Sequence, residues 1–221
     1  MGLSIHYILS KGHPLNLPAV GEIVKKLRDE AVRLGFAEVG ELTAAGPQYE
    51  WLYYWPRGAK KRSDLAPAHD GWFFSATPGE GCESMRVGLC RFAGAAGWRL
   101  EAFCKTQYAS RHGWKHFLKC HRCVIKMLRA AQKLGLRVKA EDEGGLWETN
   151  SAAVLRRNLK EYDECIAAFG GALKDAAAAA GQTMVGPIFD HPQFEHLEAR
   201  GLAEHGGKVG RAVEVVKQLV R

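Results

Sequence analysis

The 221-residue sequence lacks the features that would place it in a membrane or outside the cell. Its longest uncharged runs are shorter, or more polar, than the about 20 apolar residues that a membrane span requires. No basic segment followed by an apolar one occurs near residue 1, so we expect no secretory signal and a cytoplasmic protein without a membrane partner. The six cysteines are then expected to be reduced rather than joined in disulfides.

Several catalytic signatures are missing as well. The glycines of 79–81 and 144–145 lack the lysine of a phosphate-binding P-loop and the third glycine of a dinucleotide-binding turn. Neither a nucleophile-elbow pattern nor a Ser-His-Asp order is present. The sequence therefore indicates no particular reaction, and it leaves open whether the protein is an enzyme.

What is present is typical of a folded protein, with 47% apolar and 25% charged residues. Hydrophobic periodicity predicts a β-α-β unit over residues 1–42, with its helix between Pro18 and Gly35. The elements expected after it are strands at 72–76, 85–92 and 98–106, a helix at 113–134, a strand at 136–140, a helix from 151, a strand at 184–189 and a helix at 209–220. Gly170 and Gly171 are expected to kink or split the helix that begins near 151.

This order predicts an α/β or α+β fold with a mixed β-sheet and packed helices. Two ferredoxin-like halves around a shared sheet are one arrangement that fits it. Composition suggests an N-terminal β-α-β unit with an aromatic segment (1–56), a basic linker or loop (57–70) and a main α/β unit (71–221). A single domain that also includes 1–56 is the alternative.

Positive charge is concentrated in one segment. Between Arg111 and Lys139 there are nine basic and no acidic residues, which exceeds the net charge of +7 for the whole chain. On a helix, six of these cations share one face. We call them the basic stripe: Lys115, Lys119, Arg122, Lys126, Arg129 and Lys133.

The basic stripe has two interpretations. A row of cations about one helical turn apart suits a phosphate backbone, so nucleic acid, a nucleotide or another polyanion is one predicted partner. Alternatively, the stripe is a solvated helix face that pairs with the chain's own acidic residues or docks an acidic protein. The absence of acidic residues at i,i+4 positions favours some acidic partner.

A second segment combines aromatic and basic residues. Its members are Trp51, Tyr53 and Trp55, followed by Arg57, Lys60, Lys61 and Arg62. Aromatic side chains stack on unpaired bases while basic ones hold the phosphates, so the segment is a candidate ligand-binding site. The alternation of Trp51, Tyr53 and Trp55 is equally expected of a strand that buries one face.

An acidic loop supplies candidate catalytic residues: Asp142, Glu143 and Glu148. Carboxylates at this density can bind Mg²⁺ and activate water for hydrolysis of a phosphate ester. They could instead flank the N-terminus of the next helix, or pair with the basic helix. Loops 77–83, 105–112 and 141–149 would meet at one sheet edge if their preceding strands run the same way, forming a small-molecule enzyme site.

The helix at 113–134 also carries ligand types for zinc. His116, Cys120 and Cys123 can share a face, and a fourth ligand would come from elsewhere. The alternative is that the cysteines are packing residues and His116 is solvated. The sequence is compatible with three functions. The first is a binding protein for a phosphate-rich ligand with possible metal-dependent hydrolysis. The alternatives are a small-molecule enzyme and a non-catalytic interaction module with a basic docking helix.

Overall fold

The computed structural model describes residues 3–12, 15–56, 58, 60–61 and 64–219. The chain divides into two compact units. Residues Ser4–Glu143 form the first, which we call the sheet unit, and residues 144–219 together with Leu3 form the second, the helical unit. Of the segment 57–70, where composition suggested a linker, the described residues 58, 60–61 and 64–70 lie within the sheet unit.

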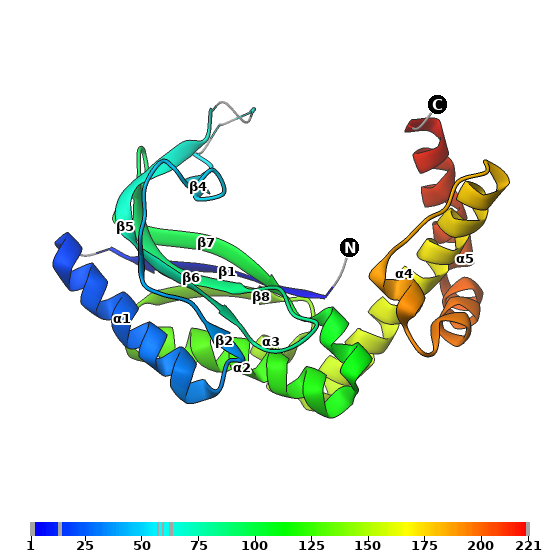
Figure 1. The fold of residues 1–221 in the computed structure, drawn as a ribbon, viewed down its shortest axis with the longest axis horizontal. Coiled ribbons are helices and arrows are strands. Elements are labelled where there is room, and N and C mark those ends of the chain that lie inside the picture. Colours follow the sequence, from blue (N-terminus) through cyan, green and yellow to red (C-terminus); the bar gives the residue numbers. More distant parts are fainter. Residues whose placement is uncertain (1–2, 13–14, 57, 59, 62–63, 220–221) are drawn as a thin grey trace. The chain divides into compact units, whose positions relative to one another are not determined.

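The sheet unit is built on one sheet of eight strands in the order β2-β5-β6-β7-β1-β8, with β3 and β4 also paired to β5 (Figure 1). Every strand pair described is antiparallel. The strands are β1 (Ser4–Lys11), β2 (Glu38–Val39), β3 (Thr43–Ala44), β4 (Tyr53–Tyr54), β5 (Ala66–Thr77), β6 (Met85–Phe92), β7 (Trp98–Lys105) and β8 (Arg137–Asp142). The first strand thus pairs with the last two long ones, and β2 lies at the far edge.

Two long helices cover one face of this sheet. Helix α1 (Leu17–Leu34) begins at Asn16, whose side chain accepts a hydrogen bond from the Ala19 amide, and ends at Gly35 with φ 75°. A 3-10 turn, η2 (Gln107–His112), leads into helix α2 (Trp114–Lys133). Both helices bury the apolar stripes that their 3.6-residue periodicity predicts.

Alternation along β1 shows which face is covered. Ile5, Tyr7 and Leu9 are buried beneath the helices, whereas His6 and Ile8 are exposed or half-buried on the other side. We call that other side the open face. In Figure 1, α1 and α2 lie on one side of the sheet and β4 on the opposite side.

Part of the open face is covered by the chain between β3 and β5. Tyr49 and Trp51 each contact the ring of Phe73 edge-on, at centroid distances of 5.0 and 5.1 Å. Leu52 is buried in the same cluster. This small second core fixes the aromatic segment over β5 and β6 and leaves the open face of β1, β7 and β8 accessible.

The helical unit consists of α3 (Leu146–Thr149), α4 (Ala152–Ala179), the 3-10 turn η3 (Pro187–Asp190) and α5 (Phe194–Leu219). Helix α4 continues through Gly170 and Gly171, so the predicted split is wrong. The glycines serve close packing instead: a Cβ on Gly171 would overlap the Glu198 carboxylate of α5. The strand predicted at 184–189 is also wrong, because a proline and 3-10 turn occupy that stretch.

The predicted fold class is confirmed, since a sheet packs against helices as an α+β arrangement. Two ferredoxin-like halves are not formed, because the described part of the chain after residue 143 contains no strand. Among the described helices, none is long and apolar enough to cross a membrane.

Candidate functional site

The central strand β1 and its two neighbours present three rows of side chains on the open face. Strand register places Phe103 and Glu141 on either side of His6. The next row is Glu101, Ile8 and Lys139, and the third is Arg99, Ser10 and Arg137. Because side chains on one face recur every two residues, successive rows are about 7 Å apart and the first and third about 13 Å.

A cavity of about 550 Å³ lies over the first two rows. Its side wall is the aromatic segment, through Trp51, Tyr53 and Trp55. The exposed fractions of Tyr53, Trp55 and Phe103 are 44%, 49% and 47%. Its volume falls within the range of about 300–1,000 Å³ typical of small-molecule sites. We call it the sheet cavity.

Flat rings make up much of the cavity surface. The rings of His6 and Phe103 form a neighbouring pair on its floor, with centroids 5.7 Å apart and planes tilted by 34°. On the wall, the guanidinium of Arg86 lies 4.0 Å from the centre of the Trp51 ring. This cation–π contact holds a positive charge at the rim, where it can meet an anion.

Tyr7 supports the floor from below. Strands β6 and β7 are described as paired only at Cys90 and Arg99. Beyond that point, the Tyr7 hydroxyl donates to the Arg86 carbonyl at 2.7 Å and accepts from the Arg86 amide at 3.1 Å. Burial raises the Tyr7 pKa well above its ordinary value, so the hydroxyl stays protonated and the Arg86 backbone stays in place.

The third row leads into a basic end of the open face. A second cavity of about 580 Å³ is lined there by Lys11, Arg99 and Arg137. Lys11 donates a hydrogen bond to the Gly135 carbonyl at 2.6 Å, and Arg99 is paired with Glu101 at 3.0 Å. The open face is therefore aromatic at one end and cationic at the other.

The structure separates the two surfaces that the sequence suggested for a polyanion. All six residues of the basic stripe are exposed on α2, and the opposite side of α2 buries Phe117, Val124 and Leu128 against the sheet unit. The stripe thus lies on the helix side of the sheet, whereas Trp51, Tyr53 and Trp55 line the open face. Lys60 and Lys61 are exposed, and the predicted Arg57 and Arg62 lie outside the described residues.

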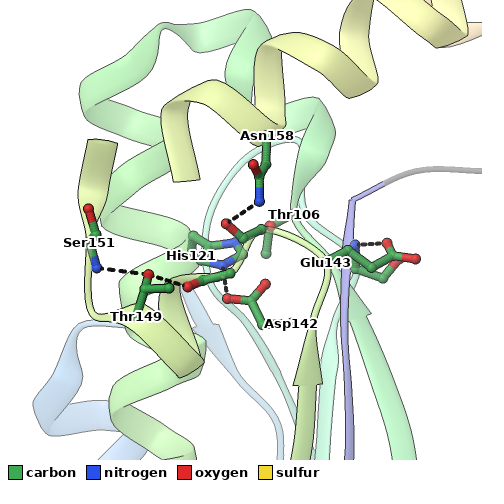
Figure 2. Close-up of polar contacts among 10 residues, drawn as sticks. Thr106, His121, Asp142, Glu143, Thr149, Ser151 and Asn158 are labelled. Carbon is green, nitrogen blue, oxygen red and sulfur yellow. Dashed lines mark hydrogen bonds and ion pairs between the residues drawn. The ribbon is translucent and has the colours of Figure 1, made fainter. Parts of the chain in front are cut away.

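Of the predicted catalytic carboxylates, Asp142 is buried. Its carboxylate lies 3.1 Å from His121 Nε2, and His121 Nδ1 lies 2.8 Å from the Thr106 hydroxyl (Figure 2). All three side chains are buried, with exposed fractions of 0% for Thr106 and His121 and 6% for Asp142. This network joins α2 and β8 to the end of β7 and holds the Asp142 carboxylate inside the sheet unit.

The other two predicted carboxylates lie apart from it. Glu143 is half-buried and accepts a hydrogen bond from the Ser4 amide at 2.7 Å, which ties the end of β8 to the start of β1. Glu148 is exposed and belongs to the helical unit. Hydrolysis at these carboxylates, with Mg²⁺ or without, stays a prediction.

His116 and Cys120 come together, but Cys123 does not join them. The Cys120 thiol lies 3.5 Å from His116 Nε2, while the Cys123 thiol is directed to the Leu34 carbonyl at the end of α1. A hydrogen bond from Cys82, followed by the charge of His116, lowers the pKa of Cys120 to about 7. Within the described ranges, no group of three or more His, Cys, Asp or Glu side chains is arranged to hold a metal ion.

The loops proposed as an enzyme site follow strands β5, β7 and β8, which run in the same direction because each is separated from the next by one antiparallel strand. Loops 77–83 and 105–112 contact each other directly. The Glu83 amide donates to the Lys105 carbonyl at 2.9 Å, and the two side chains form an ion pair at 3.5 Å. The groups at this edge are largely engaged with one another.

The residues that line the sheet cavity were mostly missed from the sequence. His6, Phe103 and Lys139 each sit in a strand that was predicted, whereas Glu141, which was expected to begin a loop, belongs to β8. What the sequence did not show is that β1, β7 and β8 are neighbours. Without the strand order, the alternating side chains of these three strands cannot be assigned to one surface.

Comparison of the chain with models of known protein families, with curated proteins and with solved structures finds no match in any of the three.

Proposed function

We propose that the open face of the sheet unit binds single-stranded nucleic acid. The observation that carries the proposal is the sheet cavity, where the half-exposed rings of Tyr53, Trp55 and Phe103 surround a space that can admit a base. Unpaired bases stack on such rings regardless of sequence, and each stacked base contributes about 1–3 kcal/mol. A base within a duplex cannot offer its faces in this way.

The cationic end of the open face supports an extended ligand. Lys11 and Arg137 line the second cavity, which continues the line of the sheet cavity along β1 and β8. The first and third rows are about 13 Å apart, which is too far for one base to span. A chain of nucleotides can place a base in the cavity and its phosphates beside these cations.

Salt dependence of oligonucleotide binding tests the proposal. We expect a fluorescently labelled uridine-rich RNA octamer to bind, as measured by anisotropy. With about three phosphate contacts, the slope of log affinity against log salt is expected to be about −2. Affinity would then fall about 15-fold between 50 and 200 mM salt.

Two variants locate the binding surface. Replacing Lys11 and Arg137 together with glutamine is expected to bring the slope to about −0.7, because one of the three phosphate contacts is left. Replacing Lys119, Arg122 and Lys126 of the basic stripe with glutamine removes more charge from the other side of the sheet and should leave the slope unchanged. The reverse pattern would assign nucleic-acid binding to α2, and no binding by the wild type would reject the proposal.

A further inference from the structure

Glu141 lies where its carboxylate can accept hydrogen bonds from the edge of a base in the sheet cavity. It lies on β8 beside His6, whose ring pairs with that of Phe103 on the cavity floor. A base stacked on the rings of His6 and Phe103 presents its hydrogen-bonding edge toward β8 when its sugar lies on the opposite side, toward β7. The Glu141 side chain is exposed and, within the described residues, has no ion pair or side-chain hydrogen bond. An ionised carboxylate accepts hydrogen bonds only.

Lys139 adds a donor next to this acceptor. It lines the same cavity two residues before Glu141, on the same face of β8 and about 7 Å away along the strand. Its ammonium group has likewise no ion-pair partner in the described part of the chain. The edge of the cavity therefore offers one acceptor group with two oxygens and, beside it, one donor group.

Among the four RNA bases, guanine has the edge that matches this pattern. Its Watson–Crick edge carries two adjacent donors, the N1 hydrogen and the 2-amino group, followed by the O6 acceptor. A carboxylate can accept from both donors at once while an ammonium group donates to O6. Adenine, cytosine and uracil each offer a single donor group on that edge, so none can fill both carboxylate oxygens through two ring-edge donors.

We propose that the sheet cavity selects guanine, with Glu141 accepting from N1 and the 2-amino group and Lys139 donating to O6. The inference rests on the proposed function, because it concerns the base that enters the same cavity. A well-formed bidentate pair discriminates against the wrong base by about 5- to 150-fold. We therefore expect about a tenfold preference for guanine.

The chain offers a matched control in Glu101. This carboxylate also lines the cavity, but Arg99 pairs with it at 3.0 Å and so already occupies one of its oxygens. Both Glu141→Gln and Glu101→Gln remove one negative charge from the open face and keep the shape of the side chain. Only the first removes the proposed base contact.

The test measures affinity for three RNA octamers that are uridine except for one central guanosine, inosine or adenosine. Inosine keeps N1 and O6 of guanosine and lacks only the 2-amino group. We expect the wild type to bind the guanosine octamer about tenfold more tightly than the adenosine octamer, with inosine between them. In Glu141→Gln the guanosine-to-adenosine ratio should fall to within twofold of 1, whereas Glu101→Gln should keep it.

The outcomes separate this inference from the proposed function. Equal affinity of the wild type for all three octamers would overturn the guanine preference and leave single-strand binding in place. An undiminished ratio in Glu141→Gln would also overturn it, since the preference would then come from another group. If none of the octamers bound, both the inference and the proposed function would fall.

Discussion

Replacing Asp142 with alanine is expected to lower the free energy of unfolding by about 3 kcal/mol. The carboxylate is buried and lies 3.1 Å from His121 Nε2, and His121 is itself fully buried. Removing one partner of a buried ionisable pair leaves the other without its hydrogen bond and typically costs about 3–5 kcal/mol. Denaturation by urea, followed by circular dichroism, measures the change.

Two milder variants show whether the loss comes from the network. Asp142→Asn keeps an oxygen that can accept from His121, and Thr106→Val removes only the hydroxyl that lies 2.8 Å from His121 Nδ1. Each is expected to cost about 1–2 kcal/mol, as for one net hydrogen bond with some desolvation. If Asp142→Ala were as stable as the wild type, the carboxylate would not be a structural group, and the catalytic interpretation of Asp142 would regain support.

Replacing Trp55 and Phe103 together with alanine is expected to weaken oligonucleotide binding at least 30-fold. These rings lie on the wall and the floor of the sheet cavity and are about half exposed, at 49% and 47%. Each stacked base is worth about 1–3 kcal/mol, so loss of both platforms removes about 2 kcal/mol or more. The measurement is the anisotropy titration with the uridine-rich octamer at fixed salt.

The matched control is Val32→Ala. Val32 is a 59% exposed apolar side chain on α1, which lies on the helix side of the sheet. It should change neither affinity nor stability noticeably, and the double aromatic variant should keep its circular dichroism spectrum. Wild-type affinity in the double variant would show that the cavity rings do not stack on the ligand.

Much of the sheet unit could be predicted because local signals agree there. Gly35 ends α1 as predicted, α1 begins one residue before the predicted Pro18, and the strand expected at 85–92 is β6. The apolar stripe of α2 identified its buried face. Local signals cannot give the strand order, since β1 pairs with residues of β7 and β8 that lie about 90 to 140 positions away in the sequence.

The helical unit was predicted less well for a physical reason. Glycine lowers helix propensity, so Gly170 and Gly171 looked like a break. In the fold they remain helical where η3 and α5 pack closely against them, with Ile188 and Phe189 beside Gly170 and Glu198 beside Gly171. Tertiary packing therefore overrides local propensity at this point, and a single sequence gives no sign of the partner.

The candidate site, too, could be predicted only in part from the sequence. Trp51, Tyr53 and Trp55 were identified from composition, and all three line the sheet cavity. The basic stripe was also identified, but only the fold shows that α2 carries it on the other side of the sheet. Asp142 was selected from the sequence as one of several carboxylates. In the fold it is buried, and its neighbour Glu141 faces the cavity because adjacent residues of a strand point to opposite faces.

Photocrosslinking tests most directly whether the open face is the nucleic-acid site. A 4-thiouridine RNA octamer is irradiated in complex with the protein, and the crosslinked peptides are identified by mass spectrometry. We expect the crosslinks to fall on the aromatic segment around Tyr53 and Trp55 and on Phe103 of β7, which line the sheet cavity. Crosslinks confined to α2 or to the helical unit would contradict the assignment of the open face.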